Sequence, residues 1–230
     1  LGLQGSRARS GTAARRVLPL RTMNERFMSR SRLRRELRQR RRALSPRQQR
    51  QASRALCRHL RASAYVRHCR HIALYWPNDG EIDPRPLRRE AEKLGKQSYL
   101  PVLHPVHRNR LWFFRLNDDT ELTQNRFGIP QPRIRGGSSR PAWALDLVLM
   151  PLVGFTEQGD RLGMGGGFYD CTFEFLKRAS CHKPRLVGLA HECQRMNSMP
   201  TASWDIAMDC IITDQGTYPV TSRNPGNGEN

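Results

Sequence analysis

The sequence predicts one α/β domain, a Rossmann-like three-layer fold with a largely parallel central sheet, preceded by a basic N-terminal helical segment. Short apolar runs alternate with helical patterns between residues 71 and 214, which favours β-α-β units. The run DLVLMPLVGF at 146–155 is almost entirely apolar, as expected for a strand covered on both faces. A chain of 230 residues has room for one such domain with tails.

The N-terminal part predicts two helices. RSRLRRELRQRRRA at 30–43 has few apolar anchors and a wide arginine face. A second helix begins after Ser45, where Pro46 suits the first helical position and Gln48 completes a capping-box pattern. It extends to about Leu60, with apolar residues at helical spacing.

The rest of the chain supplies the sheet and its covering helices. Further helices are expected at 83–95 and 168–179, and 117–145 reads as irregular. We expect 1–28 to be a disordered or upstream extension, or a transit peptide, 29–215 to be the folded domain, and 216–230 to be a flexible C-terminal tail. The other expected strands are 71–76, 97–103, 111–116, 186–191 and 209–214.

The formal charge of +20 is concentrated at one end of the chain. Residues 1–61 contain 19 arginines and two acidic residues, a net charge of +17, whereas residues 62–230 have a net charge of +3. This division argues against a basic body that wraps nucleic acid. Six scattered cysteines without a CxxC pair indicate reduced thiols in a cytoplasmic protein rather than a zinc site. No apolar run reaches the length of about 18 residues that spans a membrane.

The segment RLGMGGGFYD at 161–170 is the strongest candidate for a binding site. It follows the strongest strand, and ligands of open α/β sheets bind beyond the carboxyl ends of strands. Its spacing fits neither GxGxxG, because Phe168 stands where the last glycine would be, nor a Walker loop. Consecutive glycines still let backbone N–H groups converge on an anion, with Arg161 adding a charge. Asp170 is either a first-turn acid of the following helix or a Mg²⁺ ligand beside phosphates.

GFTEQGDRLGMGGGFYD at 154–170 resembles the glycine-rich signature of the 5-formyltetrahydrofolate cyclo-ligase family, also called 5,10-methenyltetrahydrofolate synthetases. ALSP at 43–46, DGEID at 79–83, GKQSYLPVL at 95–103, RFGIPQP at 126–132 and MPTASWDIAMD at 199–209 fit the same family in order. The resemblance covers roughly residues 30–214.

The resemblance implies an ATP- and Mg²⁺-dependent cyclisation of 5-formyltetrahydrofolate, free or polyglutamylated, to 5,10-methenyltetrahydrofolate. The formyl oxygen is phosphorylated, N10 attacks the activated carbon, and phosphate leaves. We expect Arg161 and Glu81 to act in catalysis, Asp170 and Asp205 to hold Mg²⁺ with Asp209 as a competitor, and the enzyme to be a monomer. Residues implied to bind ATP are Arg30, Arg34, Arg161, Leu162, Gly163, Met164, Gly165, Gly166, Gly167, Phe168 and Tyr169. Residues implied to meet the folate are Trp76, Glu81, Met164, Gly165, Gly166, Gly167 and Phe168.

One position departs from the family pattern. Bacterial members commonly have arginine directly after the Tyr-Asp pair, and this chain has Cys171. The loss of that cation predicts weaker nucleotide binding unless Arg178 or an N-terminal arginine compensates. Two alternatives remain open: an RNA-associated protein that uses the arginine helix at 30–42, and an ATP-independent sugar-phosphate isomerase or CoA-transferase on a similar sheet.

Overall fold

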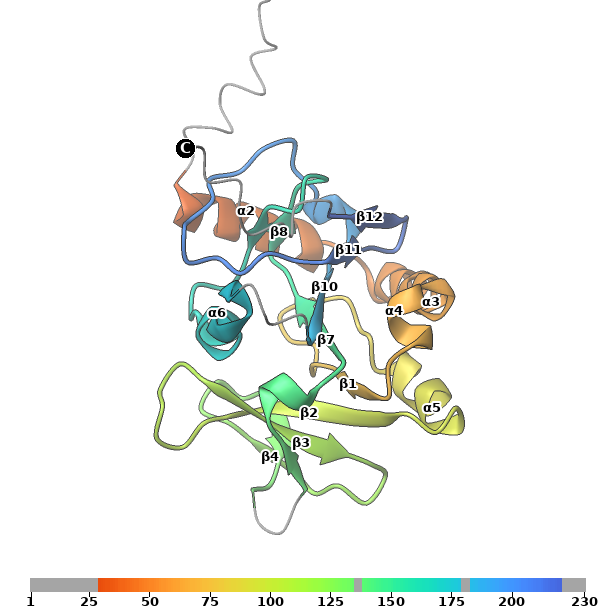
Figure 1. Ribbon diagram of the computed structural model, residues 1–230. Coiled ribbons are helices and arrows are strands. Elements are labelled where there is room, and N and C mark those ends of the chain that lie inside the picture. The colour runs from red at the N-terminus through yellow and green to blue at the C-terminus, as the bar shows by residue number, and fades with distance from the viewer. Residues whose placement is uncertain (1–28, 135–137, 179–182, 221–230) are drawn as a thin grey trace, which may run out of the picture.

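The computed structural model describes residues 29–134, 138–178 and 183–220. The predicted extension 1–28 and the tail residues 221–230 lie outside this part of the chain. An eight-stranded sheet of order β12-β11-β10-β7-β1-β2-β3-β6 organises the rest (Figure 1). Its strands are β1 (His71–Ala73), β2 (Gln97–Leu103), β3 (Leu111–Leu116), β6 (Ser139–Arg140), β7 (Leu147–Pro151), β10 (Arg185–Leu189), β11 (Cys210–Ile212) and β12 (Thr217–Pro219).

The sheet is largely parallel, as predicted. β11, β10, β7, β1 and β2 pair in parallel, and β12, β3 and β6 add antiparallel edges. Successive residues of a strand point to opposite faces, so each central strand feeds two cores. In β7, Leu147 and Leu149 pack on one side, while Val148 and Met150 pack on the other. Because both faces are buried, the apolar run predicted from sequence is continuous rather than alternating.

Helices cover the sheet as layers. α3 (Pro46–Ala62), α4 (Ala64–Arg67) and α5 (Pro86–Lys93) lie on one side, and α6 (Phe168–Thr172) lies on the other (Figure 1). α3 begins as predicted, with Ser45 as the N-cap in a capping box with Gln48 and Pro46 in the first turn. Three short 3-10 turns are η1 (Ala142–Ala144), η2 (Glu174–Lys177) and η3 (Glu192–Gln194).

Several element boundaries differ from the sequence prediction. The helix expected at 168–179 ends at Thr172, whose hydroxyl donates to the Phe168 carbonyl (2.6 Å) and accepts from the Leu111 backbone N–H (2.9 Å). The segment 117–145 is not wholly irregular, because it forms β4 (Leu122–Gln124), β5 (Pro130–Pro132) and β6. The tail was expected from residue 216, but β12 pairs with β11 as far as Pro219.

α2 (Arg30–Arg42) lies across the end of the sheet, beside the hairpin of β8 (Gly154–Phe155) and β9 (Arg161–Leu162) (Figure 1). Its two leucines, Leu33 and Leu37, are fully buried against residues of the 153–199 region. Gly154 leaves room for this helix, because a Cβ there would lie 2.4 Å from a Leu37 methyl carbon. Among the described residues, no helix combines the length and apolar character needed to cross a bilayer.

Candidate active site

The strand order reverses direction between β1 and β7. From β1 the chain moves outward to β2 and β3, and from β7 it moves the other way to β10 and β11. The carboxyl ends of the two strands at such a reversal enclose the usual ligand crevice of an open α/β sheet. The turn at 77–83 follows β1, and the glycine-rich segment lies in the connection that follows β7. The fold therefore brings DGEID and RLGMGGGFYD to one place.

α2 lines this place with a row of arginines. Arg30, Arg34, Arg38 and Arg41 are four, four and three residues apart, which places them on one helix face. Arg30 donates to both carboxylate oxygens of Asp205 (2.8 and 3.1 Å), and Arg34 donates from Nε to the Gly163 carbonyl (2.8 Å). Arg38 and Arg41 reach the turn after β1. One helix therefore holds three segments that are distant in sequence.

The glycine-rich loop uses its bare backbone at defined positions. Gly165 has a φ of +97° and Gly167 a φ of +67°, where residues with a Cβ are strained. A Cβ on Gly165 would lie 3.4 Å from the Arg34 guanidinium carbon, and a Cβ on Gly166 would lie 2.7 Å from the Phe168 ring. Met164 is half exposed at the outer side of the loop. The loop is thus folded directly under Arg34.

Some residues that were predicted to contact the nucleotide have buried side chains. Leu162 is fully buried and packs under α2, and the Tyr169 ring stacks on Phe173 with centroids 6.4 Å apart. Arg161 is also buried: its Nε donates to the Ile206 carbonyl (2.9 Å) and its guanidinium pairs with Asp170. A direct contact between Arg161 and a phosphate would require this pair to open.

The two predicted metal ligands lie close together. Asp170 accepts a hydrogen bond from the Ile206 backbone N–H (3.1 Å), and Asp205 is the preceding residue. Asp209 sits elsewhere, at the amino ends of the strands, where it accepts from Arg185 (2.8 Å) and the Leu186 N–H (2.7 Å). The geometry therefore favours Asp205 over Asp209. The described residues contain no cluster of three or more His, Cys, Asp or Glu side chains suited to a metal, but Mg²⁺ commonly uses one or two carboxylates together with substrate phosphates.

Glu81 and Trp76 occupy the turn after β1. The Glu81 carboxylate accepts from the Asn78 N–H (3.1 Å) and lies 3.7 Å from the Arg41 guanidinium. Burial raises the pKa of Glu81 to about 7, against the opposing effect of Arg41. Trp76 is partly buried, and the Arg85 guanidinium lies 4.4 Å from its ring centroid. Glu81 is thus a carboxyl group that can change its ionisation near neutral pH.

Sequence reasoning missed four neighbours of this site. Arg38, Arg41 and Asp79 form an ion-pair cluster beside Glu81, and the spacing of the two arginines relative to Leu33 and Leu37 on α2 was the signal that could have found them. Phe127 belongs to RFGIPQP, a segment that fits the family pattern but for which the sequence predicted no function. Its ring meets Phe168 edge-on at 5.9 Å and is 53% exposed. An exposed aromatic surface therefore borders the glycine loop.

A cavity of about 590 Å³ lies away from these residues, between α3, η3 and the residues after β11. Its walls include Gln48, Arg54, Arg58, Glu192 and Asp214, and none of the predicted site residues lines it. The strand-order reversal is the candidate active site, because the glycine loop, the arginine row and the paired carboxylates converge there.

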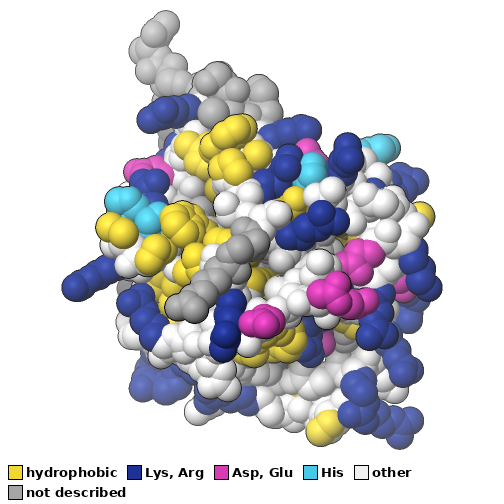
Figure 2. Space-filling view, turned by 90° about the horizontal axis from the view of Figure 1, so that it is seen from below, with side chains coloured by type: hydrophobic (Ala, Val, Ile, Leu, Met, Phe, Trp, Pro, Cys, Tyr) yellow, Lys and Arg dark blue, Asp and Glu magenta, His cyan; other side chains and the backbone are white. Residues whose placement is uncertain are grey.

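The contacts of α2 bear on the RNA-binding alternative. Six of its eight arginines have protein partners: Arg30, Arg34, Arg38, Arg40, Arg41 and Arg42. Figure 2 shows a face away from α2, and there Lys and Arg side chains surround a central group of hydrophobic side chains without forming a single stripe. The arginine-rich helix is therefore occupied mainly with the protein itself.

Comparison with known proteins identifies the family of this chain. The model of the 5-formyltetrahydrofolate cyclo-ligase family matches residues 26–214. A 5-formyltetrahydrofolate cyclo-ligase from Escherichia coli K12 is 38% identical over 77% of this chain and 96% of its own, and one from Haemophilus influenzae is 39% identical over 80% and 96%. The structure of 5,10-methenyltetrahydrofolate synthetase from Aquifex aeolicus superposes with a TM-score of 0.72 at 28% identity, covering 86% of this chain and 95% of that one. This chain belongs to the 5-formyltetrahydrofolate cyclo-ligase family.

Proposed function

We propose that this protein converts 5-formyltetrahydrofolate to 5,10-methenyltetrahydrofolate with consumption of ATP. One observation carries the proposal: the arginine row of α2 closes over the glycine-rich loop at the reversal point of the sheet, with Arg34 bonded to the Gly163 carbonyl at 2.8 Å. Backbone amides of a glycine-rich loop and nearby guanidinium groups together make a site for phosphates. Family membership supplies the reaction.

The reaction follows from the weakness of an amide oxygen as a leaving group. Attack of the formyl oxygen on the γ-phosphorus forms an O–P bond and breaks the bond to ADP. N10 then attacks the activated carbon, loses its proton, and phosphate leaves with the former formyl oxygen. Little covalent chemistry is asked of the protein, so catalysis consists of positioning and charge stabilisation.

The nucleotide half of the site lies between α2 and the glycine loop. Arg30 and Arg34 would contact the phosphates, and the backbone from Gly163 to Gly167 would cradle them. Asp170 suits a Mg²⁺ ion, because one of its oxygens has no protein partner among the described residues. Asp205 would join it by releasing Arg30, which contacts both of its oxygens. When bound there, the ion would neutralise charge on the phosphates.

The folate half lies on the side of Glu81. Its carboxylate is the acceptor for N–H groups of the reduced folate, and Trp76 and Phe168 give apolar surface for rings. Phe127 extends that surface beyond the residues expected from sequence. None of these groups forms a covalent bond with a substrate. Their role in this proposal is to hold the two substrates in line.

The proposal includes a monomeric enzyme that acts on small molecules in the cytoplasm. The free cysteines Cys57, Cys69 and Cys210 are buried in the core, which suits a reducing compartment. Size-exclusion chromatography with light scattering tests the oligomeric state. Stabilisation of the protein by ATP in a thermal melt separates this function from the isomerase or CoA-transferase alternative, which needs no nucleotide.

The deciding experiment is conversion itself. Purified protein with 5-formyltetrahydrofolate, ATP and Mg²⁺ should produce the near-ultraviolet absorbance of the methenyl product, together with one ADP for each product molecule. A parallel reaction without ATP should stay flat. Absence of product in the complete mixture contradicts the proposal.

A further inference from the structure

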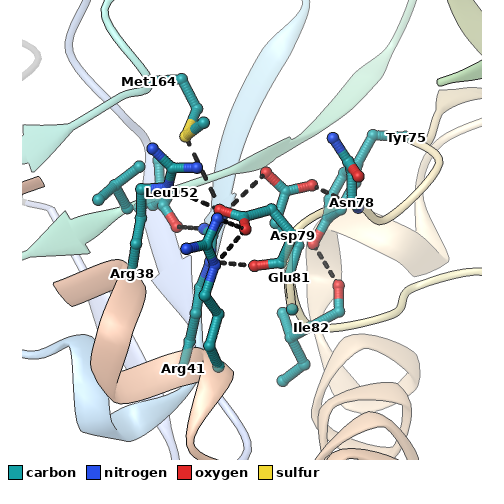
Figure 3. A network of polar contacts seen from close by, with 12 residues as sticks. Arg38, Arg41, Tyr75, Asn78, Asp79, Glu81, Ile82, Leu152 and Met164 are labelled. Carbon is teal, nitrogen blue, oxygen red and sulfur yellow. Dashed lines mark hydrogen bonds and ion pairs between the residues drawn. The ribbon is translucent and has the colours of Figure 1, made fainter. Parts of the chain in front are cut away.

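Arg41 is a charged side chain enclosed entirely within the protein. It has no exposed surface, although it belongs to a helix on the outside of the sheet. Its Nε donates to the Asp79 carbonyl (2.8 Å), one terminal nitrogen reaches the Leu152 carbonyl (3.4 Å), and the other reaches the Asp79 carboxylate (3.0 Å). The same nitrogen lies 3.7 Å from Glu81 (Figure 3). A buried guanidinium that bonds to several groups at once restricts the positions of those groups.

The Asp79 carboxylate is shared by three arginines. Arg38 donates to it at 2.6 Å, Arg42 pairs with it from the exposed side, and Arg41 contacts it from within. Burial would raise the pKa of Asp79, but the hydrogen bonds from Arg38, Arg42 and Arg41 outweigh burial and lower it. Arg38 and Arg42 supply two further positive charges to Asp79. Arg41 is therefore not the only cation beside Asp79, and its charge also acts on Glu81.

The turn that carries Glu81 is held in an unusual shape. Asp79 has a φ of +54°, which non-glycine residues rarely adopt. The bond from Arg41 to the Asp79 carbonyl fixes this residue, and the Tyr75 hydroxyl fixes the other end of the turn by donating to the Ile82 carbonyl (2.5 Å). A Cβ on Gly80 would lie 3.4 Å from the Arg41 carbonyl, so the turn lies close against α2.

We propose that Arg41 is a positioning residue that fixes the carboxylate of Glu81 for the folate substrate and joins it to the nucleotide loop. The join is physical, because the Arg41 guanidinium also lies 4.0 Å from the Met164 sulfur in the glycine-rich loop. The inference rests on the proposed function, in which Glu81 contacts folate. It adds a residue that touches neither substrate and orients the groups that do.

The ionisation of Glu81 supplies a readout that a purely structural role would not move. The groups that face Glu81 are Arg38 and Arg41 from α2, Asp79 from its own turn, Tyr75 before that turn and Tyr169 from α6. Arg41 is the cation with the largest effect, and it lowers the pKa of Glu81. Its removal moves the acid limb of kcat/KM for 5-formyltetrahydrofolate to higher pH, because ionised Glu81 becomes harder to form.

The test compares Arg41→Met and Arg41→Lys with Arg35→Met, a control on the same helix. Arg35 is exposed and has no side-chain partner within the described residues. We expect Arg41→Met to lower kcat/KM for 5-formyltetrahydrofolate by about 100-fold, the cost of a small misplacement of a substrate-positioning group. Arg41→Lys should recover part of this loss, because it restores the charge but not the three-way hydrogen bonding. Arg35→Met should behave as the wild type in rate and pH profile.

A double-mutant cycle links Arg41 to Glu81. In a Glu81→Gln background, Arg41→Met should cause much less than its own loss, since contacting residues in one network are not additive. If the two losses multiply, or if the acid limb stays in place in Arg41→Met, the inference is wrong. Circular dichroism checks folding, and Arg41→Lys carries the test if Arg41→Met does not fold. Loss of product formation in the wild type would contradict the proposed function instead, so the two failures are distinct.

Discussion

α2 and α3 are consecutive arginine-rich helices that use their arginines in opposite ways. α2 has eight arginines in 13 residues, and α3 has five in 17. Within the described residues, six of the eight in α2 contact protein groups, whereas Arg61 alone in α3 has a partner, Glu90 at 3.2 Å. The other four of α3 are exposed. A run of arginines in a helix therefore does not by itself show whether their side chains meet protein groups or solvent.

The difference comes from the apolar anchors. α3 buries Ala52, Leu56 and Leu60 against the sheet and leaves its arginines on the opposite side. α2 has only Leu33 and Leu37 to anchor it, and they dock beside the glycine loop. The arginines next to those leucines are consequently directed at loop carbonyls and carboxylates. The position of two leucines decides what the arginines do.

The largest effect is expected from removing an anchor. Leu37→Ala and Leu56→Ala each delete a fully buried side chain, so each should lower the unfolding free energy by about 2–5 kcal/mol. Only Leu37→Ala should also raise KM for ATP in the folded enzyme, because it loosens α2 above the loop. Urea denaturation and steady-state kinetics separate the two quantities. Equal kinetic effects of both variants would remove the contrast between the helices.

Ionisation of Glu81 gives the next effect. Its pKa is raised from 4.5 to about 7 in the folded protein, so the folded state binds more protons than the unfolded state between these values. Stability should therefore fall as pH rises through this window, by about 3 kcal/mol from this group. Urea denaturation at several pH values should show that Glu81→Gln loses the slope. Glu90→Gln, which changes the half-exposed partner of Arg61, should keep the slope.

Nucleotide binding should respond to Arg34 and not to its counterpart on α3. Arg34→Met removes a charged donor from the Gly163 carbonyl and from the phosphate site, which should raise KM for ATP by roughly 10-fold or more. Arg54→Met on α3 should leave KM for ATP unchanged. ATP titration by calorimetry provides the direct measurement, and equal affinities of the two variants would place the nucleotide elsewhere.

A smaller effect is expected from the loop side of the same contact. Gly165→Ala introduces a Cβ at a positive φ, 3.4 Å from the Arg34 guanidinium carbon. A residue with a Cβ in this backbone conformation raises the conformational free energy of the loop by about 1–2 kcal/mol. The variant should weaken ATP binding with little change in KM for folate. Gly216→Ala is the control, because a Cβ there meets no atom within 4 Å. An unaltered ATP affinity in Gly165→Ala would contradict the placement of phosphates on this loop.

The smallest effect on catalysis is expected from the exposed face of α3. Replacing Arg50, Arg54 and Arg58 together with Met should leave kcat and both KM values unchanged. Retention on an RNA column should fall for this variant at low salt, since exposed arginines carry non-specific phosphate contacts. A loss of enzymatic rate in the triple variant would show that α3 takes part in the site.

Much of this fold follows directly from the sequence pattern. β2, β3 and α2 match their predicted ranges almost to the residue, because apolar runs and capping residues mark them. β4 and β12 were missed, because they are short and largely exposed and so have no apolar signature. The helix after the glycine loop was predicted too long, since its sequence pattern does not reveal that Thr172 bonds to β3.

The candidate site was predictable only in part. The spacing of its glycines predicted a binding site at 161–170. The metal and folate residues were expected only from the family resemblance. Arg38 and Arg41 were missed because the eight arginines of the helix were not sorted by their position relative to Leu33 and Leu37, which mark the docking face. Asp79 was missed because its three arginine partners come from that helix. Burial of Arg161 was equally hidden, since the residue that covers it, Ile206, lies 45 positions away.

The arginine row of α2 also sets an order of assembly. Asp79, the partner of Arg38 and Arg41, follows them by 41 and 38 positions, whereas Gly163 follows Arg34 by 129 and Asp205 follows Arg30 by 175. On a ribosome, where chains emerge from the N-terminus, the helix can meet the turn after β1 early, but it cannot meet the glycine-rich loop or Asp205 until most of the chain has been made. The sheet can begin to form without the helix, whereas the nucleotide site cannot. Nucleotide would therefore bind only when the chain is nearly complete. A truncated chain would contain the first strands of the sheet but no functioning nucleotide site.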